Sequence, residues 1–570
     1  MNQRSPSALR RYPPSADGPV TWDKIIAVIL GLGCLPHDAP AEPPSAAGSV
    51  PIQSQSASAG PPSAADNSQI LRQLEQDAVQ GDPESQYLLG RIWAEGLGSR
   101  TDYLAARQWF EKSAKQGHAK AALALGRLYD AGHIPGVDSG MPEIQAMGWY
   151  LAAAEGGSVD APFHLGSAYA EGRLVPRDDK LAVQWYLKAA RAGHVDAQYN
   201  LGILYRRGIN GVQEPENARI WLQKATDQKH AAAAYNLGSM YLLGDGIPTD
   251  MNKAHTCFLI AAQQEHAQAQ FQLGLMYFLG KGVSVDIAQG IHWFRQAGNN
   301  GDLNALNNLG VIYKKGVGTQ ADPQQAVAFF EKAAQRGSTT AQKNLGLMYE
   351  DGQGVARDMR QAAHWYGAAA RQGDPEAQNN LGILYYKGAG DQPNLTKARY
   401  WLEKAASAGN VQAQNNLGEL LLDDKGPFHN PELALTWLRK AATRGLAQAQ
   451  YNLALHLATR AGQQEAAWTE VIDWFRKAAT QEHALAQFQL GSKYLHGVGV
   501  ARDPRQARYW LEKAAQQNNP EAQNNLGMLH LQGIGVPQND AEALRWFQLG
   551  ANQNHPESQS NLQYMLDRKR

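Results

Sequence analysis

One six-residue string, AQNNLG, occurs three times in this 570-residue chain, at 377–382, 413–418 and 522–527. The first two copies start 36 residues apart, and the third starts one residue beyond a further three intervals of that length. A fixed internal period of this size is the signature of stacked repeats, each of which contacts mainly its neighbours. A single compact core is therefore not expected, and the length of the chain also argues against one.

The Leu-Gly pair of this string marks one position in each of thirteen units. Almost every step between marks is 36 residues, except 40 between Gly126 and Gly166 and 37 between Ala454 and Gly491. The marks are Gly90, Gly126, Gly166, Gly202, Gly238, Gly274, Gly310, Gly346, Gly382, Gly418, Ala454, Gly491 and Gly527. About nineteen residues after each mark comes a tryptophan, which Cys257 and Phe329 replace in two units.

Each unit has the pattern of two amphipathic helices, as residues 374–409 show. Asp374 is a good N-cap for the first helix, and Gly388 can take the left-handed conformation that ends it. Apolar side chains form one stripe on each helix: Ala377, Leu381, Leu384 and Tyr385 on the first, and Ala398, Trp401, Leu402, Ala405 and Ala406 on the second. Neither helix can bury its stripe alone, so neighbouring units must stack into one continuous core.

Small residues and chain ends fit this scheme. Gly382 removes a side chain from the first helix, so that another backbone or a tryptophan ring can approach closely. Residues 68–81 have the pattern of a second helix without its first, and residues 556–568 that of a first helix without its second. We expect both segments to be terminal capping helices, because the end repeats of a stack need a polar outer face.

Composition and cysteine count exclude several functional classes. Lys and Arg total 53 and Asp and Glu also total 53, so the chain lacks the basic excess typical of nucleic-acid binding. Two cysteines, Cys34 and Cys257, are too few for a disulfide framework or a structural zinc site. Cys257 stands in a tryptophan position, where we expect it to fill core space rather than to act as a nucleophile.

Two recurring patterns imitate chemical motifs. Gly-x-Gly pairs such as Gly280/Gly282 lack the third glycine or the Lys-Ser/Thr of a phosphate loop, so we expect them to form turns between helices. Six histidines share one slot that Asp, Ser or Asn fills in other units: His118, His194, His230, His266, His483 and His555. These are N-cap residues, and neighbouring slots should lie about 10 Å apart, too far for one metal shell. We predict a non-enzymatic protein without metal or cofactor.

The first 66 residues differ from the repeats. Basic residues precede an uncharged apolar run at 25–35, which at eleven residues is shorter than the approximately 20 of a membrane span. This order is typical of a signal peptide. Residues 39–41 offer a cleavage site, Cys34 in LGLGC resembles a bacterial lipoprotein box and is a candidate for lipidation, and an uncleaved short anchor is the third alternative.

These features divide the chain into three parts. We predict a signal peptide or a membrane or lipid anchor over residues 1–41, and a disordered Pro/Ser/Ala linker over 42–66. The repeats then occupy 67–570. The expected location is outside the cytoplasm, either periplasmic, anchored so as to face the periplasm, or secreted, with membrane contact only through the N-terminal segment.

The repeat resembles the Sel-1-like repeat (SLR) family, relatives of tetratricopeptide repeats. The stretch AQKNLGLMYEDGQGVARDMRQAAHWYGAAA at 341–370 carries the pattern, and the resemblance covers about residues 68–568. It implies an all-α, right-handed α-solenoid of about thirteen tandem 36-residue helix-turn-helix repeats with terminal capping helices, whose first helices line the concave face. Members are typically adaptors of protein complexes, and the leader fits the bacterial envelope type.

A row of amides is the first part of the candidate binding surface. The slot two residues before the mark holds Asn200, Asn236, Asn308, Asn344, Asn380, Asn416, Asn452, Asn525 and Asn561, with Gln272 and Gln489 in two further units. Amides donate and accept together, so such a row can hold an extended peptide by its backbone, as related tetratricopeptide grooves do. The alternative is that each Asn ties one repeat to the next.

The slot three residues before the mark is the second part. It holds Tyr199, Tyr235 and Phe271 in early units and Asn379 and Asn415 in the middle. On a helical wheel Asn379 points away from the core, toward the concave lining. The aromatic faces could contact apolar side chains or sugar rings, or else pack against neighbouring helices.

The sequence therefore predicts an interaction scaffold of the cell envelope that binds another protein, as an extended segment, in the concave groove. The alternative function is an envelope factor that supports polysaccharide assembly or export, with the corresponding machinery as partner. Neither function involves nucleic acid.

Overall fold

The computed structural model describes residues 64–97, 100–134, 142–209, 211–388, 391–462 and 464–568. Within these ranges the chain forms 28 helices and no strand, apart from one isolated bridge between Ile209 and Val212. The predicted all-α solenoid is confirmed. The apolar run 25–35, Cys34 and the predicted anchor and cleavage site lie outside the described residues, as does most of the linker. No helix in the described ranges is long and apolar enough to cross a bilayer.

The repeats divide into two compact units, one ending at residue 312 but including 317–319, the other comprising 313–316 and everything from 320 onward. The first contains α2 (Ala64–Gln80), α3 (Pro83–Glu95), α4 (Tyr103–Ala114), α5 (Ala119–Asp130), α6 (Pro142–Glu155), α7 (Ala161–Glu171), α8 (Asp179–Arg191), α9 (Val195–Arg207), α10 (Pro215–Asp227), α11 (Ala231–Leu243), α12 (Met251–Ala262), α13 (Ala267–Leu279), α14 (Ile287–Asn299) and most of α15 (Leu303–Lys315).

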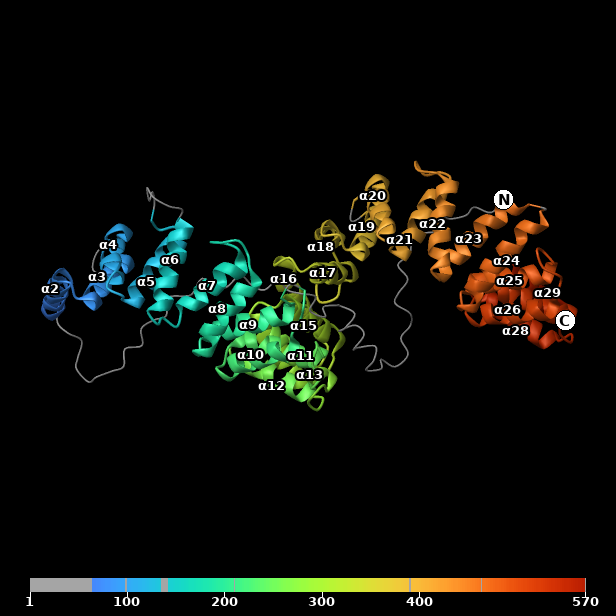
Figure 1. Ribbon diagram of the computed structural model, residues 1–570. Coiled ribbons are helices and arrows are strands. Elements are labelled where there is room, and N and C mark those ends of the chain that lie inside the picture. The colour runs from blue at the N-terminus through green and yellow to red at the C-terminus, as the bar shows by residue number, and fades with distance from the viewer. Residues whose placement is uncertain are drawn as a thin grey trace. The chain divides into compact units, whose positions relative to one another are not determined.

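The second unit contains α16 (Pro323–Gln335), α17 (Thr339–Asp351), α18 (Met359–Arg371), α19 (Pro375–Lys387), α20 (Leu395–Ser407), α21 (Val411–Leu422), α22 (Pro431–Thr443), α23 (Ala447–Ala461), α24 (Glu465–Thr480), α25 (Ala484–His496), α26 (Pro504–Gln516), α27 (Pro520–Gln532), α28 (Asp540–Ala551) and α29 (Pro556–Arg568). Odd-numbered helices from α3 onward are the first helices of repeats, and even-numbered helices are the second. Within each unit consecutive helices pack against one another in chain order (Figure 1).

Local signals set the ends of these helices. The Asp374 side chain accepts a hydrogen bond from the Ala377 amide, 2.6 Å away, and caps α19. Gly388 then ends α19 in the left-handed region, at φ 104°. Asn394 is the N-cap of α20. Both predicted ends of α19 are thus confirmed, because caps act within three or four residues.

The mark glycines allow close packing, but the tryptophan is not their partner. A Cβ atom on Gly346 would lie 2.7 Å from the Tyr366 ring, and one on Gly382 would lie 2.8 Å from Leu402. Both partners directly follow the tryptophan slot in sequence and are fully buried. Of the two alternatives, the tryptophan ring is therefore wrong, whereas a backbone does approach Gly382, where the added Cβ would lie 3.2 Å from the Ala398 carbonyl oxygen. A one-residue shift turns the tryptophan about 100° around the second helix, toward the helix surface.

Other core predictions hold. Cys257 is buried at 5% exposure and packs in a cluster with Phe258 and Leu237, as a space-filling residue would. The pair Gly280/Gly282 forms a turn in which both residues have positive φ. Both capping helices also form: α2 begins at Ala64, inside the segment assigned to the linker, and α29 ends the stack as a first helix alone.

Candidate functional site: the amide row of the first helices

The predicted site residues fall into two groups by burial. Asn308, Asn379, Asn415 and Asn416 are buried, at 2–6% exposure. The half-buried group comprises Asn200, Asn236, Asn344, Asn380, Asn452, Asn525, Tyr199, Tyr235 and Phe271. We call the slot two residues before the mark the amide row. Only its half-buried members offer polar atoms to a ligand without the helices moving apart.

Part of the amide row ties neighbouring repeats. The Asn416 Nδ2 donates to the Asn379 Oδ1 at 2.9 Å, and the Asn452 Nδ2 donates to the Asn415 Oδ1 at 3.0 Å. The Asn561 Nδ2 makes the same bond to Asn524 at 2.9 Å. Each bond links the amide row of one first helix to the preceding slot of the helix before it. The interpretation that each Asn ties one repeat to the next therefore accounts for these three contacts.

The expectation that Asn379 faces an open lining is wrong. Its side chain is 6% exposed and bonds to Asn416. A helical wheel separates the face toward the second helix from the rest of the helix, but a first helix in a stack also packs against the first helices on either side. Asn379 lies on one of these lateral contacts.

The amide row changes partners where the neighbouring slot is aromatic. The Asn200 Nδ2 donates to the Tyr186 hydroxyl at 3.3 Å, and the Asn236 Oδ1 accepts from the Arg206 Nη1 at 3.0 Å. Burial raises the pKa of Tyr186 to about 12, so its hydroxyl remains neutral. One repeat earlier, His164 fills the slot, and burial lowers its pKa to about 3. A neutral His164 can accept the hydrogen bond that the Arg127 Nε donates to it at 3.1 Å.

Histidines cover the aromatic faces. Tyr199 stacks on His230 and Tyr235 on His266, each with ring centroids 4.7 Å apart. Phe271 instead lies tilted against Phe294, at 5.5 Å. Of the two interpretations of this slot, packing against neighbouring helices describes these contacts, because one face of each stacked ring is already occupied.

The histidine slot caps helices, as predicted. The His118 Nδ1 accepts from the Ala121 amide at 3.2 Å, and the same bond occurs at His194, His230, His266, His483 and His555. The opposite nitrogen of His230 lies 3.3 Å from the Asp196 carboxylate, and this contact lowers the pKa of Asp196. Among the described residues, no three His, Cys, Asp or Glu side chains are grouped to hold a metal ion.

One carboxylate joins the amide row. Glu419 on α21 accepts hydrogen bonds from the Asn415 Nδ2, at 3.3 Å, and from the Asn452 Nδ2. Burial raises the pKa of Glu419, although both amides partly oppose that shift. The resulting cluster of amides and one carboxylate is polar and half-open, and can exchange hydrogen bonds with a peptide.

Sequence reasoning missed a second set of amides, four residues before the mark. The side chains of Gln86, Gln198, Gln270, Gln342, Gln378, Gln414, Gln450, Gln487 and Gln523 are buried, and each Nε2 donates to a backbone carbonyl eight residues earlier at 2.9–3.1 Å. The signal was available, because the Gln of AQNNLG recurs as faithfully as its Asn. A polar residue next to the buried Ala of the stripe should have indicated a hydrogen-bonding role.

Most of these glutamines also accept a bond from the end of the next second helix. The Gln372 Nε2 donates to the Gln342 Oε1 at 2.8 Å, and six other pairs repeat this contact. In two units the donor position holds Ala408 or Arg444, and the buried Oε1 atoms of Gln378 and Gln414 have no partner. These hydrogen bonds therefore join neighbouring repeats, and in two units the donor is missing.

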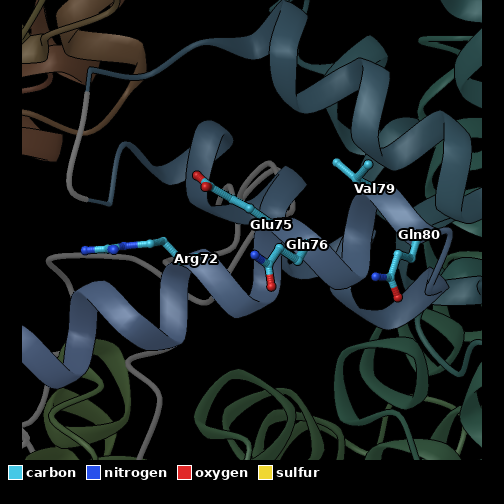
Figure 2. A pocket seen from close by; sticks show the side chains of 5 residues that line it. All are labelled: Arg72, Glu75, Gln76, Val79 and Gln80. Carbon is cyan, nitrogen blue, oxygen red and sulfur yellow. The ribbon is translucent and has the colours of Figure 1, made fainter.

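Hollows on the surface lie away from the amide row. One, of about 330 Å³, is lined by Arg72, Glu75, Gln76, Val79 and Gln80. Figure 2 shows that all five belong to the single helix α2. A ligand site normally has polar groups that converge from several elements, so this hollow is not a candidate. A second hollow lies among α18, α19 and α20.

Comparison with known families decides the identity of the repeat. The Sel1 repeat model matches thirteen segments, at 83–118, 119–158, 159–194, 195–230, 231–266, 267–302, 303–338, 339–374, 375–410, 411–446, 472–483, 484–519 and 520–555. The chain belongs to the Sel1 repeat family. Sel1 repeat solenoids are generally non-enzymatic scaffolds for protein–protein interaction.

Two solved structures are similar to this chain, and the first of them supports the assignment. A protective antigen present in uropathogenic Escherichia coli strains, which displays an SLR fold, is 32% identical over 74% of this chain and 90% of that chain, with a TM-score of 0.66. A Sel1 repeat protein from Oxalobacter formigenes is 34% identical over 54% of this chain and 88% of that chain, with a TM-score of 0.48. A comparison with curated protein sequences gives no match.

Proposed function

We propose that this Sel1 repeat protein is a non-enzymatic scaffold of the cell envelope that holds an extended segment of a partner protein along its first helices. The observation that carries the proposal is the set of half-buried amides in the amide row, Asn200, Asn236, Asn344, Asn380, Asn452 and Asn525. They recur on successive or nearby first helices. Asn452 also bonds to Asn415 and Asn236 to Arg206, whereas the Asn416–Asn379 bond between repeats uses two buried members of the slots.

The spacing suits an extended chain. First helices that pack at a helix-packing distance lie about 10 Å apart. An extended peptide advances about 3.3 Å per residue, so every third residue of the partner would meet one amide. An amide can donate to a backbone carbonyl or accept from a backbone N–H, so this contact tolerates many partner sequences.

Two matched variants test the amide row. The first changes the half-buried Asn380 and Asn525 to Ala, and the second changes the buried pair Asn379 and Asn416 to Ala. Both proteins are used to capture partners from membranes, with mass spectrometry of what co-purifies, and both are melted. We expect the first variant to lose partner capture with an unchanged melting temperature, and the second to melt at a lower temperature because buried hydrogen bonds are lost.

Intact partner capture by the first variant would contradict the proposal. Recovery of a polysaccharide synthase or an outer-membrane exporter as the main partner would favour the alternative, a factor for polysaccharide assembly or export. Capture of a partner that is held through its sugar rather than its backbone would also persist after loss of the amides.

The envelope location has its own test. Residues 1–66 fused to a reporter that is active only outside the cytoplasm should give activity in a bacterial host, because a basic lead and an apolar run direct export. Changing Ile26 and Ile29 to Arg should abolish that activity, and persistent activity would contradict export. Cys34→Ser should release the protein from membranes only if Cys34 is lipidated.

A further inference from the structure

One second helix departs from its counterparts at two positions that face the same way. Several second helices carry an Arg–Glu ion pair there: Arg107–Glu111, Arg399–Glu403 and Arg508–Glu512, with N–O distances of 2.6–2.7 Å. In α18 the same two positions hold Ala363 and Gly367, and no other unit has glycine at the second of them. The other units place side chains larger than alanine at both positions, so α18 alone has small residues at both.

These two small residues border a hollow of about 380 Å³ among α18, α19 and α20. Ala363 and Gly367 line it together with Leu381, Tyr385 and Trp401. A Cβ atom on Gly367 would lie 3.4 Å from the Arg371 Nη1 and 3.9 Å from the Leu381 Cδ2, so a larger side chain here would enter the hollow. The volume is at the lower end of the range for ligand pockets, about 300–1,000 Å³.

The rim of the hollow is cationic. Arg360, Arg371 and Lys397 line it, against one carboxylate, Asp391, which pairs with Arg360. Within the described part of the chain, no carboxylate lies within ion-pair distance of Arg371 or Lys397. The Lys397 Nζ lies 5.2 Å from the centre of the Tyr385 ring. Two cations thus remain available beside aromatic and apolar walls.

We propose that this hollow, the Gly367 pocket, binds the carboxylate of an acidic residue in a partner protein, with the neighbouring apolar or aromatic residue against Trp401 and Tyr385. Guanidinium groups match the planar geometry of a carboxylate. Asp391 on the rim disfavours a phosphate, which carries about twice the negative charge of a carboxylate. No residue of the amide row lines this pocket, and Asn380 of α19 is not among its lining residues, so the pocket is distinct from the amide row.

The probe is the dipeptide acetyl-Trp-Glu-amide, with acetyl-Trp-Gln-amide as its neutral match. Binding to the full chain is measured by ligand-observed NMR titration at low ionic strength. We expect the acidic dipeptide to bind about tenfold more tightly than the neutral one, since a charge-assisted hydrogen bond is lost in the latter. Added salt should weaken the binding, because the rim charges are exposed.

The decisive variant combines Ala363→Arg with Gly367→Glu. It rebuilds the ion pair that α20 carries at Arg399 and Glu403, fills the hollow and improves helix propensity, so the protein should stay folded. Binding of the acidic dipeptide should fall at least about tenfold. Arg371→Gln should weaken it several-fold, whereas Lys440→Gln, which removes a cation from α22, should leave it unchanged.

Three outcomes would overturn the proposal. They are undiminished binding to the Ala363→Arg/Gly367→Glu variant with an unchanged melting curve, equal binding of the neutral dipeptide, and displacement of the acidic dipeptide by an equimolar amount of inorganic phosphate. No binding to the unaltered protein at low millimolar concentration would overturn it as well. None of these measurements depends on partner capture by the amide row, so the two proposals fail separately.

Discussion

Glycine at the mark is required by a contact with a side chain twenty residues later in sequence, or twenty-four later at Gly126. A mid-helix glycine normally costs about 0.5–1 kcal/mol relative to alanine. On Gly274, however, a Cβ atom would lie 2.5 Å from the Phe294 ring, which is fully buried and has nowhere to move. Ala454 fills the mark in one unit, which is one residue longer than most others, so the stack can adapt locally.

Gly274→Ala should therefore destabilise the protein by about 1–3 kcal/mol, the usual cost of overpacking. Its matched control is Gly148→Ala on α6, where an added Cβ meets nothing within 4 Å. That change should stabilise α6 by up to about 1 kcal/mol. Urea denaturation followed by circular dichroism measures both effects, and similar shifts of the same sign would contradict the packing argument.

A half-buried capping histidine links stability to pH. Burial lowers the pKa of His483 from 6.5 to about 4. Because the folded state binds the proton less well than the unfolded state, the stabilisation is complete above pH 6.5 and is lost as the pH falls toward 4. Between pH 7 and pH 5 the loss attributable to this group is about 1–2 kcal/mol.

His483→Asn should remove that part of the acid sensitivity. Asn fills the same slot at Asn410 and Asn519 and caps the helix there, so the cap is kept while the titration is lost. The variant and the unaltered protein are compared by urea denaturation at pH 7 and pH 5. An equal loss of stability in both proteins would mean that His483 does not carry the effect.

Between elements, the buried glutamines do more than the asparagines to hold repeats in register. Gln342 on α17 bonds at one end to the Ala334 carbonyl of the preceding second helix and at the other to Gln372, which follows α18. One side chain thus connects three consecutive helices. Where Gln372 is replaced by Ala408, the Gln378 Oε1 is left buried without a donor, which costs about 1–3 kcal/mol.

Ala408→Gln should repair this defect. Ala408 and Gln372 are both C-cap residues with nearly identical backbone angles, φ −74° and ψ 1° against φ −80° and ψ 0°, so the new side chain can reach Gln378 as Gln372 reaches Gln342. We expect stabilisation of about 0.5–1.5 kcal/mol. Gln372→Ala is the reverse control and should destabilise. A neutral result for both would show that the contact contributes nothing to stability.

At the scale of the whole molecule, stability is a sum of repeats and their interfaces. Contacts within each unit run from one helix to the next along the chain. Asp374 and Asn410 occupy the same N-cap slot of successive first helices and make the same bond. Any junction cut at this slot therefore rejoins equivalent residues, as nearest-neighbour packing requires.

Deleting the complete repeat 374–409 should leave a folded protein with the same helical signal per residue. Deleting only its first half, 374–391, should not, because it places two second helices in succession. Far-UV circular dichroism and cooperative melting distinguish the two. Equal folding of both deletions, or unfolding of the first, would contradict the modular description.

The sequence alone determined the period, the two helices of each repeat, their caps and the all-α class. Each of these depends on residues three to eight apart on one helix, or on a strict repeat that thirteen copies make plain. Asp374 as a cap, Gly388 as a stop and the histidine slot could be predicted because backbone geometry fixes such contacts locally. The signal peptide or anchor that the apolar run 25–35 indicates stays a prediction.

Only the tertiary structure decided which face of each first helix stays open. A helical wheel finds the stripe that faces the second helix, but Asn379 and Asn416 are buried by a lateral contact between repeats, 37 residues apart. The buried role of Gln378 and the pocket at Gly367 likewise depend on how three helices meet. Such contacts follow from the rotation of each helix about its axis in the stack, which sequence spacing leaves free and which close packing fixes.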